Sequence, residues 1–140
     1  MIEGFPTEAE NRRFEEAFTG LFNFVTAPFY WKTLEPRPGV VRFACGSESI
    51  YRRPPPDVVL EFARKHSLAI KGHPLVWDNP THQVPEWLPE ETQTRESALW
   101  DNLERNIMRY RGSIPYWDVV NEACSRHVNV PMPRDFVFRA

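Results

Sequence analysis

The chain has 140 residues, which is enough for one ordinary domain with a sizeable hydrophobic core. Its 17 basic and 19 acidic residues give a formal net charge of -2 and are spread along the chain, so neither nucleic acid nor a membrane is expected as a partner. Aromatic residues make up 14% of the chain and include five tryptophans, which suit stacking on sugar rings as well as packing in a core.

Apolar residues at helical spacing predict a first helix over residues 8–19. Thr7 followed by Glu10 three residues later forms a capping box at its start, and Gly20 is the expected stop. The apolar, β-prone run 21–26 follows at once. It is expected to form a buried strand.

Turn-forming residues dominate the segment 27–57, which is predicted to be one long loop. Long loops inside compact folds are often functional. Asp57 is expected to cap a second helix. The side chains that share one face of this helix are Val59, Phe62, Ala63 and His66. The apolar run 68–77 is predicted to be the next strand, and it leads into a Pro-rich loop over 78–89.

A third helix follows this loop, with Gly112 just past its end. Its apolar stripe consists of Leu99, Leu103, Ile107 and Tyr110. Residues 114–120 are predicted to form the last strand. The alternation of helices and strands is typical of parallel α/β units. Three strands do not close a barrel, and a parallel sheet needs cover on both faces, so the elements predict a slice of a larger α/β fold.

The last predicted strand ends in the pair Asn121 and Glu122. Cleavage of a glycosidic bond needs a carboxylic acid to protonate the leaving oxygen, and catalytic groups of (β/α) barrels lie at the carboxyl ends of strands. Asn121 would hydrogen-bond a sugar hydroxyl. On the dipeptide alone, the commoner interpretation is a solvated turn after a strand, because short motifs are weak signals.

The second predicted strand contains His73, Leu75 and Trp77 at a spacing of two, which predicts that all three side chains point the same way. At a barrel mouth the imidazole would bond a sugar and the indole would stack beneath it. The alternative is a satisfied core histidine and a core tryptophan.

The segment after the first strand offers Lys32 as a donor to sugar hydroxyls and Tyr30 or Trp31 as a stacking surface. The alternative is a solvated lysine beside loop aromatics. Cys45 and Cys124 fit no metal spacing, and their pairing is left open. The sequence contains no Gly-rich phosphate loop, no serine nucleophile elbow and no metal-ligand cluster, so no metal or cofactor is expected.

Three blocks, in this order, resemble glycoside hydrolase family 10, the endo-1,4-β-xylanases. The blocks are 22–26 with Lys32 and Glu35-Pro36, then 72–77, and then 117–123. The resemblance implies a (β/α)₈ TIM barrel, of which this chain forms about three βα units, and a retaining mechanism on β-1,4-linked xylan-type polysaccharides or oligosaccharides. It also implies that Glu122 is the general acid/base. The residues implied for the substrate-binding subsite are Lys32, His73, Trp77 and Asn121.

The chain departs from the family pattern at two places. The family usually carries Pro-Glu-Asn-Glu-Met-Lys where this chain has residues 27–32, so Pro28 and Phe29 replace the Glu and Asn that grip the next sugar. Strict preference for xylan therefore does not follow. After Trp77 the family usually has His-Ser-Gln, whereas this chain has Asp78-Asn79-Pro80, and Gln83 is the candidate to serve in place of the family's Gln.

A retaining enzyme needs a second carboxylate, the nucleophile, at about 5–5.5 Å from the acid/base. In the family it lies on a strand well downstream of Asn-Glu, whereas residues 136–140 look like the start of the next helix. We therefore expect residues 1–140 to be a partial catalytic domain that lacks the first strand and the C-terminal half and is inactive alone. The parent enzyme is expected to be monomeric and secreted or periplasmic, although this chain shows no signal peptide.

Two alternatives remain open at this point. One is another retaining TIM-barrel β-glycanase, similar to a cellulase or a mannanase. The other is a fragment that binds sugar without catalysis, through Trp31, Trp77 and Trp87, or that is inert.

Overall fold

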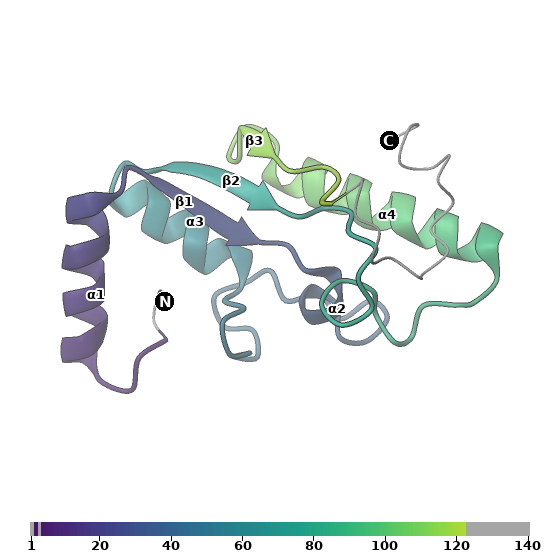
Figure 1. Cartoon of the computed structure of the whole chain (residues 1–140), viewed down its shortest axis with the longest axis horizontal. Coiled ribbons are helices and arrows are strands. Elements are labelled where there is room, and N and C mark those ends of the chain that lie inside the picture. Colours follow the sequence, from purple (N-terminus) through teal and green to yellow (C-terminus); the bar gives the residue numbers. More distant parts are fainter. Residues whose placement is uncertain (1, 3, 123–140) are drawn as a thin grey trace.

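The structure is a computed structural model, and it describes residue 2 and residues 4–122 (Figure 1). In chain order the elements are α1 (Glu8–Leu21), β1 (Phe24–Pro28), α2 (Trp31–Leu34), α3 (Pro56–Lys65), β2 (Ala69–His73), α4 (Thr92–Tyr110) and β3 (Tyr116–Trp117). The strands form a parallel sheet in the order β1-β2-β3. The predicted α/β class with parallel strands is therefore confirmed, and the short helix α2 is an addition to it.

Helices α3 and α4 pack on one face of the sheet, and α1 lies at the end of the strands where β1 begins (Figure 1). Side chains along β1 and β2 alternate between buried and exposed, as they do in a half-covered strand. Val25, Ala27 and Ile70 pack there against α3 and the end of α4. On the opposite face Phe24 and Ala69 are exposed. The expected cover on both faces is thus present on only one of them in the part of the chain that the structure describes.

Trp117 joins the two groups of core side chains, one under β1 and α3 and the other under α4. Its ring lies directly over Gly72 of β2, where an added Cβ would come within 2.3 Å of the indole. The ring also packs edge-on against Phe29, with 4.8 Å between the ring centroids. Glycine at position 72 therefore allows β3 to lie close beside β2 with its tryptophan in the core.

The N-terminal helix α1 is capped as predicted. Thr7 Oγ1 accepts from the backbone N–H of Glu10 at 3.2 Å, and a Glu10 carboxylate oxygen accepts from the backbone N–H of Thr7 at 3.1 Å. The predicted end at Gly20 is wrong, because the helix continues to Leu21 and closes with the Phe22 N–H on the Phe18 carbonyl at 2.8 Å. Strand β1 consequently begins three residues later than expected.

Asp57 does not cap α3, which begins at Pro56. Its carboxylate instead accepts from the Tyr110 hydroxyl at 2.7 Å and pairs with Arg109 at 2.7 Å, so it ties the start of α3 to the end of α4. The predicted loop over 27–57 therefore contains the end of β1, the helix α2 and the first two residues of α3.

The buried stripe of α4 differs from the predicted one at a single position. Leu99, Leu103 and Tyr110 are buried as predicted, but Ile107 is 41% exposed. Asn106 is fully buried in its place, and its amide donates to the Asn102 carbonyl oxygen at 3.1 Å. This hydrogen bond satisfies the Asn106 amide nitrogen, whereas the Asn106 side-chain oxygen has no hydrogen-bond partner among the described residues. No helix among the described residues combines the length and the apolar character needed to cross a membrane.

Candidate active site

The chain segments that follow β2 and β3 continue side by side and bring Trp77 and Glu122 together. Gly72 pairs with Trp117 in the sheet, and Val76 makes a further parallel bridge with Val120. The Trp77 indole N–H then donates to a Glu122 carboxylate oxygen at 2.9 Å. Two predicted site residues from strands 45 positions apart are thus in direct contact.

A bulge separates these two pairings. Four residues lead from Gly72 to Val76, but only three lead from Trp117 to Val120, so the β2 side carries one extra residue. Pro74 lies within this stretch, at a position typical of proline because it has no N–H to donate to a ladder. The bulge therefore shifts the register between the segments that follow β2 and β3.

The prediction that His73, Leu75 and Trp77 point the same way is wrong for Leu75. Leu75 is fully buried against α4. His73 and Trp77 do share a side, since both rings lie edge-on to Tyr30, with centroids at 5.9 Å and 6.2 Å. The imidazole, the indole and the phenol therefore gather at the carboxyl ends of β1 and β2.

Asp118 orients His73. One Asp118 carboxylate oxygen lies 2.8 Å from His73 Nδ1 and 2.7 Å from Lys71 Nζ. Lys71, together with His73, holds the pKa of Asp118 below its usual range. A carboxylate on Nδ1 selects the tautomer that carries its proton there, which leaves Nε2 of a neutral ring to face a substrate as an acceptor.

Of the two candidate stacking residues, only Tyr30 has an accessible ring. Trp31 is only 3% exposed and packs in the core under α4, which excludes it from contact with a sugar. Tyr30 is half-buried, and the Arg53 guanidinium lies 3.9 Å from its ring centre. His82 was missed by sequence reasoning, and it stacks on Trp77 at 5.8 Å. The one signal for His82 in the sequence is its position directly before Gln83.

Lys32, the predicted donor to sugar hydroxyls, is in contact with the loop after β2. Its ammonium pairs with the exposed Glu86 at 2.9 Å and donates to the Pro80 carbonyl at 3.3 Å. Both partners belong to the loop after β2, and Lys32 is half-buried between them. These two contacts hold the loop against α2, and Lys32 lies two residues after Tyr30 in the sequence.

Gln83 does not have the predicted contact with a sugar, because it is only 2% exposed and its amide is used by the backbone. Its oxygen accepts from the Trp31 N–H at 3.1 Å, and its nitrogen donates to the Leu75 carbonyl at 3.0 Å. Burial of an amide requires such partners. Gln83 is therefore a brace between α2 and the segment beyond β2.

Phe29 and Glu35 are also structural. Phe29 is fully buried, with its ring centroid 5.2 Å from that of Tyr110. Glu35 is 3% exposed and accepts from the Trp31 indole at 2.9 Å and from the Gly39 N–H at 2.8 Å. Arg105 also pairs with this carboxylate. Phe29, which replaces the family's Asn, thus packs inside the protein and presents no polar group to a ligand.

No cluster of histidine, cysteine, aspartate and glutamate suited to a metal ion occurs among the described residues. Cys124 and the expected helix start at 136–140 lie outside the described residues, so those predictions stay untested.

Parallel strands with covering helices are the arrangement of part of an α/β barrel, a fold whose ligand sites lie at the carboxyl ends of the strands, where this chain has a carboxylate and aromatic rings. The model of glycosyl hydrolase family 10 matches residues 7–138, and the chain belongs to this family. The recognition made from the three sequence blocks is thereby confirmed.

Curated relatives agree with this membership. The chain is 32% identical over 111 residues to a β-1,4-xylanase of Dictyoglomus thermophilum, a match that covers 79% of this chain and 26% of the relative. It is 32% identical over 109 residues to endo-1,4-β-xylanase B of Thermotoga neapolitana, with 74% and 28% covered. The chain thus spans about a quarter of the length of these relatives.

Solved structures show the same fold. A family 10 xylanase of Thermobacillus composti matches with a TM-score of 0.68 at 29% identity, over 91% of this chain and 36% of that one. Xylanase 10B of Thermotoga petrophila, solved in complex with xylobiose, matches with a TM-score of 0.71 at 25% identity, over 89% and 36%. The predicted fold, a part of a (β/α)₈ TIM barrel, is confirmed.

Proposed function

We propose that Glu122 is the general acid/base of a retaining glycoside hydrolase that cleaves β-1,4-linked xylan-type polysaccharides. The observation that carries this proposal is the 2.9 Å hydrogen bond from the Trp77 indole to Glu122 at the carboxyl ends of two adjacent parallel strands. Family membership and the relatives described as xylanases support the substrate class. Glu122 would protonate the glycosidic oxygen and then deprotonate the water that releases the bound sugar.

The contact with Trp77 suits this role. The indole N–H holds one carboxylate oxygen, so the rotamer of Glu122 is restrained while the other oxygen remains for the leaving group. Glu122 also has a φ of 54°, in the left-handed region where a residue other than glycine costs about 1–2 kcal/mol. Strained backbone of this kind concentrates at functional sites. The strain supports a role for Glu122 beyond ending a strand.

The remaining members of the proposed subsite surround this pair. Asn121 is held by its backbone N–H on the Val76 carbonyl at 2.8 Å, and its half-buried side chain would bond a sugar hydroxyl. His73 would accept from a sugar hydroxyl through Nε2. Trp77 and Tyr30 would contact the ring faces, and Lys32 would donate to a hydroxyl at the edge of the subsite.

The nucleophile is proposed to lie outside the described residues. Asp118 is engaged by Lys71 and His73, and Glu35 is buried and paired with Arg105. Neither carboxylate is available to attack an anomeric carbon. Residues 1–140 are accordingly proposed to be a partial catalytic domain that supplies the acid/base half of the carboxylate pair and does not turn over substrate alone.

The decisive test is Glu122→Gln in the hydrolase that contains this chain. Loss of the acidic proton should lower kcat on xylan by about 10²–10⁴-fold, because general acid catalysis typically contributes that much. An aryl glycoside with a strongly acidic phenol needs no proton on its leaving group, so its first step should be nearly unaffected. The matched control is Glu61→Gln, which changes an exposed carboxylate on α3 and should leave both rates unchanged. Undiminished turnover of xylan by the Glu122→Gln variant would exclude the proposed role.

A second candidate is a related β-glycanase that acts on cellulose- or mannan-type chains. The burial of Phe29 supports this candidate, because the family's Asn at this position contacts the sugar and Phe29 does not reach it. Rates on a panel of xylan, cellulose and mannan oligosaccharides would distinguish the substrates. Titration calorimetry of the isolated chain with xylo-oligosaccharides addresses the non-catalytic alternative, since absence of heat would leave an inert fragment.

A further inference from the structure

His82 extends the group of aromatic rings around Glu122 on its exposed side. Its imidazole stacks on the Trp77 indole, with 5.8 Å between the ring centroids and 21° between the ring planes. The same indole donates to a Glu122 carboxylate oxygen at 2.9 Å. His82 therefore contacts the side chain that holds the proposed acid/base.

The backbone on both sides of His82 is anchored. The Asn79 side-chain oxygen accepts from the N–H groups of Thr81 and His82, each at 3.0 Å, as in the turns that asparagine typically forms. In the next residue, the Gln83 carbonyl accepts from the Lys32 N–H at 2.9 Å, and the buried Gln83 amide bonds the backbone of two further segments. The position of the imidazole relative to the indole is therefore set by an ordered part of the loop.

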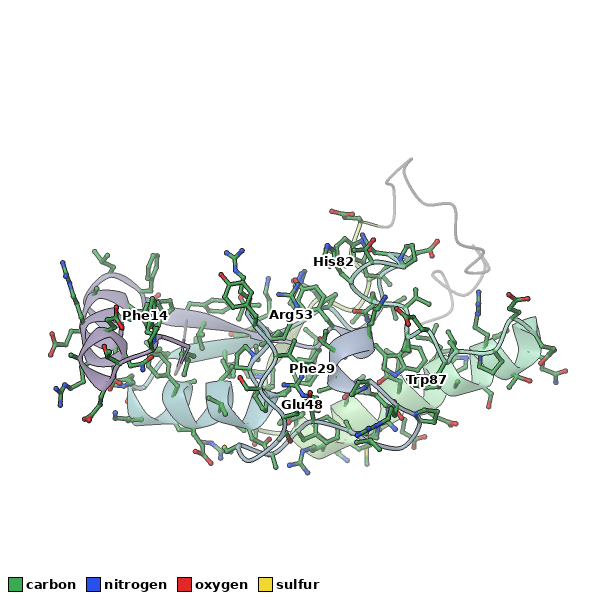
Figure 2. All side chains as sticks on the ribbon, turned by 90° about the horizontal axis from the view of Figure 1, so that it is seen from below. Phe14, Phe29, Glu48, Arg53, His82 and Trp87 are labelled. Atoms are coloured by element: carbon green, nitrogen blue, oxygen red, sulfur yellow. The ribbon has the colours of Figure 1, made fainter. Side chains whose placement is uncertain are left out.

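The imidazole of His82 has no polar partner in the part of the chain that the structure describes. Within residues 4–122 its ring nitrogens form no hydrogen bond and no ion pair, and the side chain is exposed. By contrast, His66 and His73 each lie 2.8 Å from a carboxylate oxygen. In Figure 2 His82 lies on the loop after β2, apart from the buried Phe29. The contact that His82 does make is the one between its ring face and Trp77.

The Trp77 indole has room to tilt. A space of about 20 Å³ borders it, and the core side chains that line this space include Trp31, Val76 and Leu99. Because about 10–15 Å³ is enough for one water molecule, the close packing of the core is interrupted beside the indole. A tilt into this space would change the hydrogen bond to Glu122. A ring stacked on the indole restricts such a movement.

We propose that His82 is a positioning residue of the glycosidase, whose ring holds the Trp77 indole in the orientation that bonds Glu122. The inference rests on the proposed function, because it takes Glu122 to be the general acid/base. Offset stacking of two rings is favourable at centroid distances of about 4.5–7 Å. The indole is thus held at its nitrogen by the carboxylate and at a ring face by the imidazole.

The kinetic test measures kcat/KM in the hydrolase that contains this chain. His82→Ala should lower kcat/KM on xylan about fivefold, in line with the loss of one aromatic pair. An aryl glycoside with a strongly acidic phenol needs no proton on its leaving group, so its kcat/KM should be nearly unchanged. An equal loss on both substrates would overturn the positioning role, because a general disturbance of the fold would lower both.

A double-mutant cycle separates positioning from direct contact with the sugar. Trp77→Phe deletes the donor to Glu122, so His82→Ala should have little further effect on xylan turnover in that background. If the imidazole contacted the substrate itself, the fivefold loss would persist in the Trp77→Phe background. That result would overturn the proposal.

Two further variants locate the effect in the ring of His82. His82→Phe keeps a ring that can stack but has no nitrogen, so it should restore most of kcat/KM on xylan. Failure of this variant to restore the rate would show that a ring nitrogen is needed, contrary to the proposal. Thr81→Ala is the matched control, because it changes an exposed side chain whose backbone alone bonds Asn79. A loss in this control as large as that of His82→Ala would overturn the assignment to His82.

A spectroscopic test of the same hydrolase requires no turnover. Near-UV circular dichroism reports fixed packing of aromatic side chains, and the difference between the original protein and Trp77→Phe isolates the signal of Trp77. We expect His82→Ala to lose most of this signal and Thr81→Ala to retain it. An unchanged signal in His82→Ala would overturn the positioning role. Full turnover of xylan by Glu122→Gln, with the expected loss of signal in His82→Ala, would overturn the proposed function but leave the hold of His82 on Trp77 intact.

Discussion

Glu35 and Glu122 form the same type of contact in two very different places. Each accepts a hydrogen bond from an indole N–H at 2.9 Å: Glu35, directly after α2, from Trp31, and Glu122, beyond β3, from Trp77. Glu35 is 3% exposed, whereas Glu122 is exposed. The surroundings therefore determine whether such a pair stabilises the fold or is available to a substrate.

The region around Glu35 is a closed network. Its carboxylate binds Trp31, Gly39 and Arg105, and its backbone carbonyl accepts from the Trp87 indole at 2.8 Å. These partners come from α2, the loop after it, α4 and the loop before α4. Because Glu35 is also only 3% exposed, this network leaves its carboxylate out of reach of a substrate. Glu122 has one indole donor and an open side.

The largest effect on stability is expected for Glu35→Ala. Removing one partner of a buried ion pair typically costs 3–5 kcal/mol, and because Arg105 is partly exposed we expect a loss of about 3 kcal/mol in the free energy of unfolding. Urea denaturation measures this loss. Glu90→Ala, at an exposed loop position, is the control and should change stability by less than about 0.5 kcal/mol. A cost for Glu35→Ala as small as that of the control would remove the distinction between the two glutamates.

The second prediction exchanges the two tryptophans for phenylalanine. Trp77→Phe keeps an aromatic ring but deletes the donor to Glu122, and it should lower turnover of xylan about tenfold, equivalent to about 1.4 kcal/mol, with little change in stability. Trp31→Phe deletes the donor to the buried Glu35. It should cost about 1–3 kcal/mol of stability and leave turnover per folded molecule unchanged.

Rates and unfolding free energies of both variants separate the two roles. If Trp77→Phe lost stability and kept its rate, the contact with Glu122 would be structural. If Trp31→Phe lowered the rate of the folded enzyme, the network around Glu35 would extend to the chemistry.

Sequence reasoning succeeded where the signal is local. The capping box of Thr7 and Glu10 depends on residues three apart, and the apolar runs depend on spacing within one element. The three blocks identified the family before any contact was known. Glu122 and Trp77 were selected separately, and the structure brings them together.

What sequence reasoning missed depends on distant partners. The bulge at Pro74 is defined only by the register against β3, and Leu75 is buried by residues of α4 that are distant in the sequence. The sequence suggests Gln83 as a residue that binds the substrate, but its amide is hydrogen-bonded to the backbone of Trp31 and Leu75. Asp57 has the ordinary pattern of a helix cap, and only the fold shows that Tyr110 is its partner. In each case a tertiary contact competes with the local role that the sequence suggests.

The smallest effect is expected at Asp118, which lies between the two extremes. Its folded pKa is lowered, chiefly by Lys71 and further by His73, so its contribution to stability is present above the ordinary value of about 3.9 and is lost as the pH falls through the folded value. The side chains of Lys71 and Asp118 are 30% and 36% exposed, so the contribution should stay below about 1 kcal/mol. Asp118→Asn should therefore flatten the acid limb of a plot of unfolding free energy against pH and change stability little near neutral pH. Urea denaturation at a series of pH values measures this limb. A loss at neutral pH as large as that of Glu35→Ala would make Asp118 part of the buried framework rather than of the substrate-facing edge.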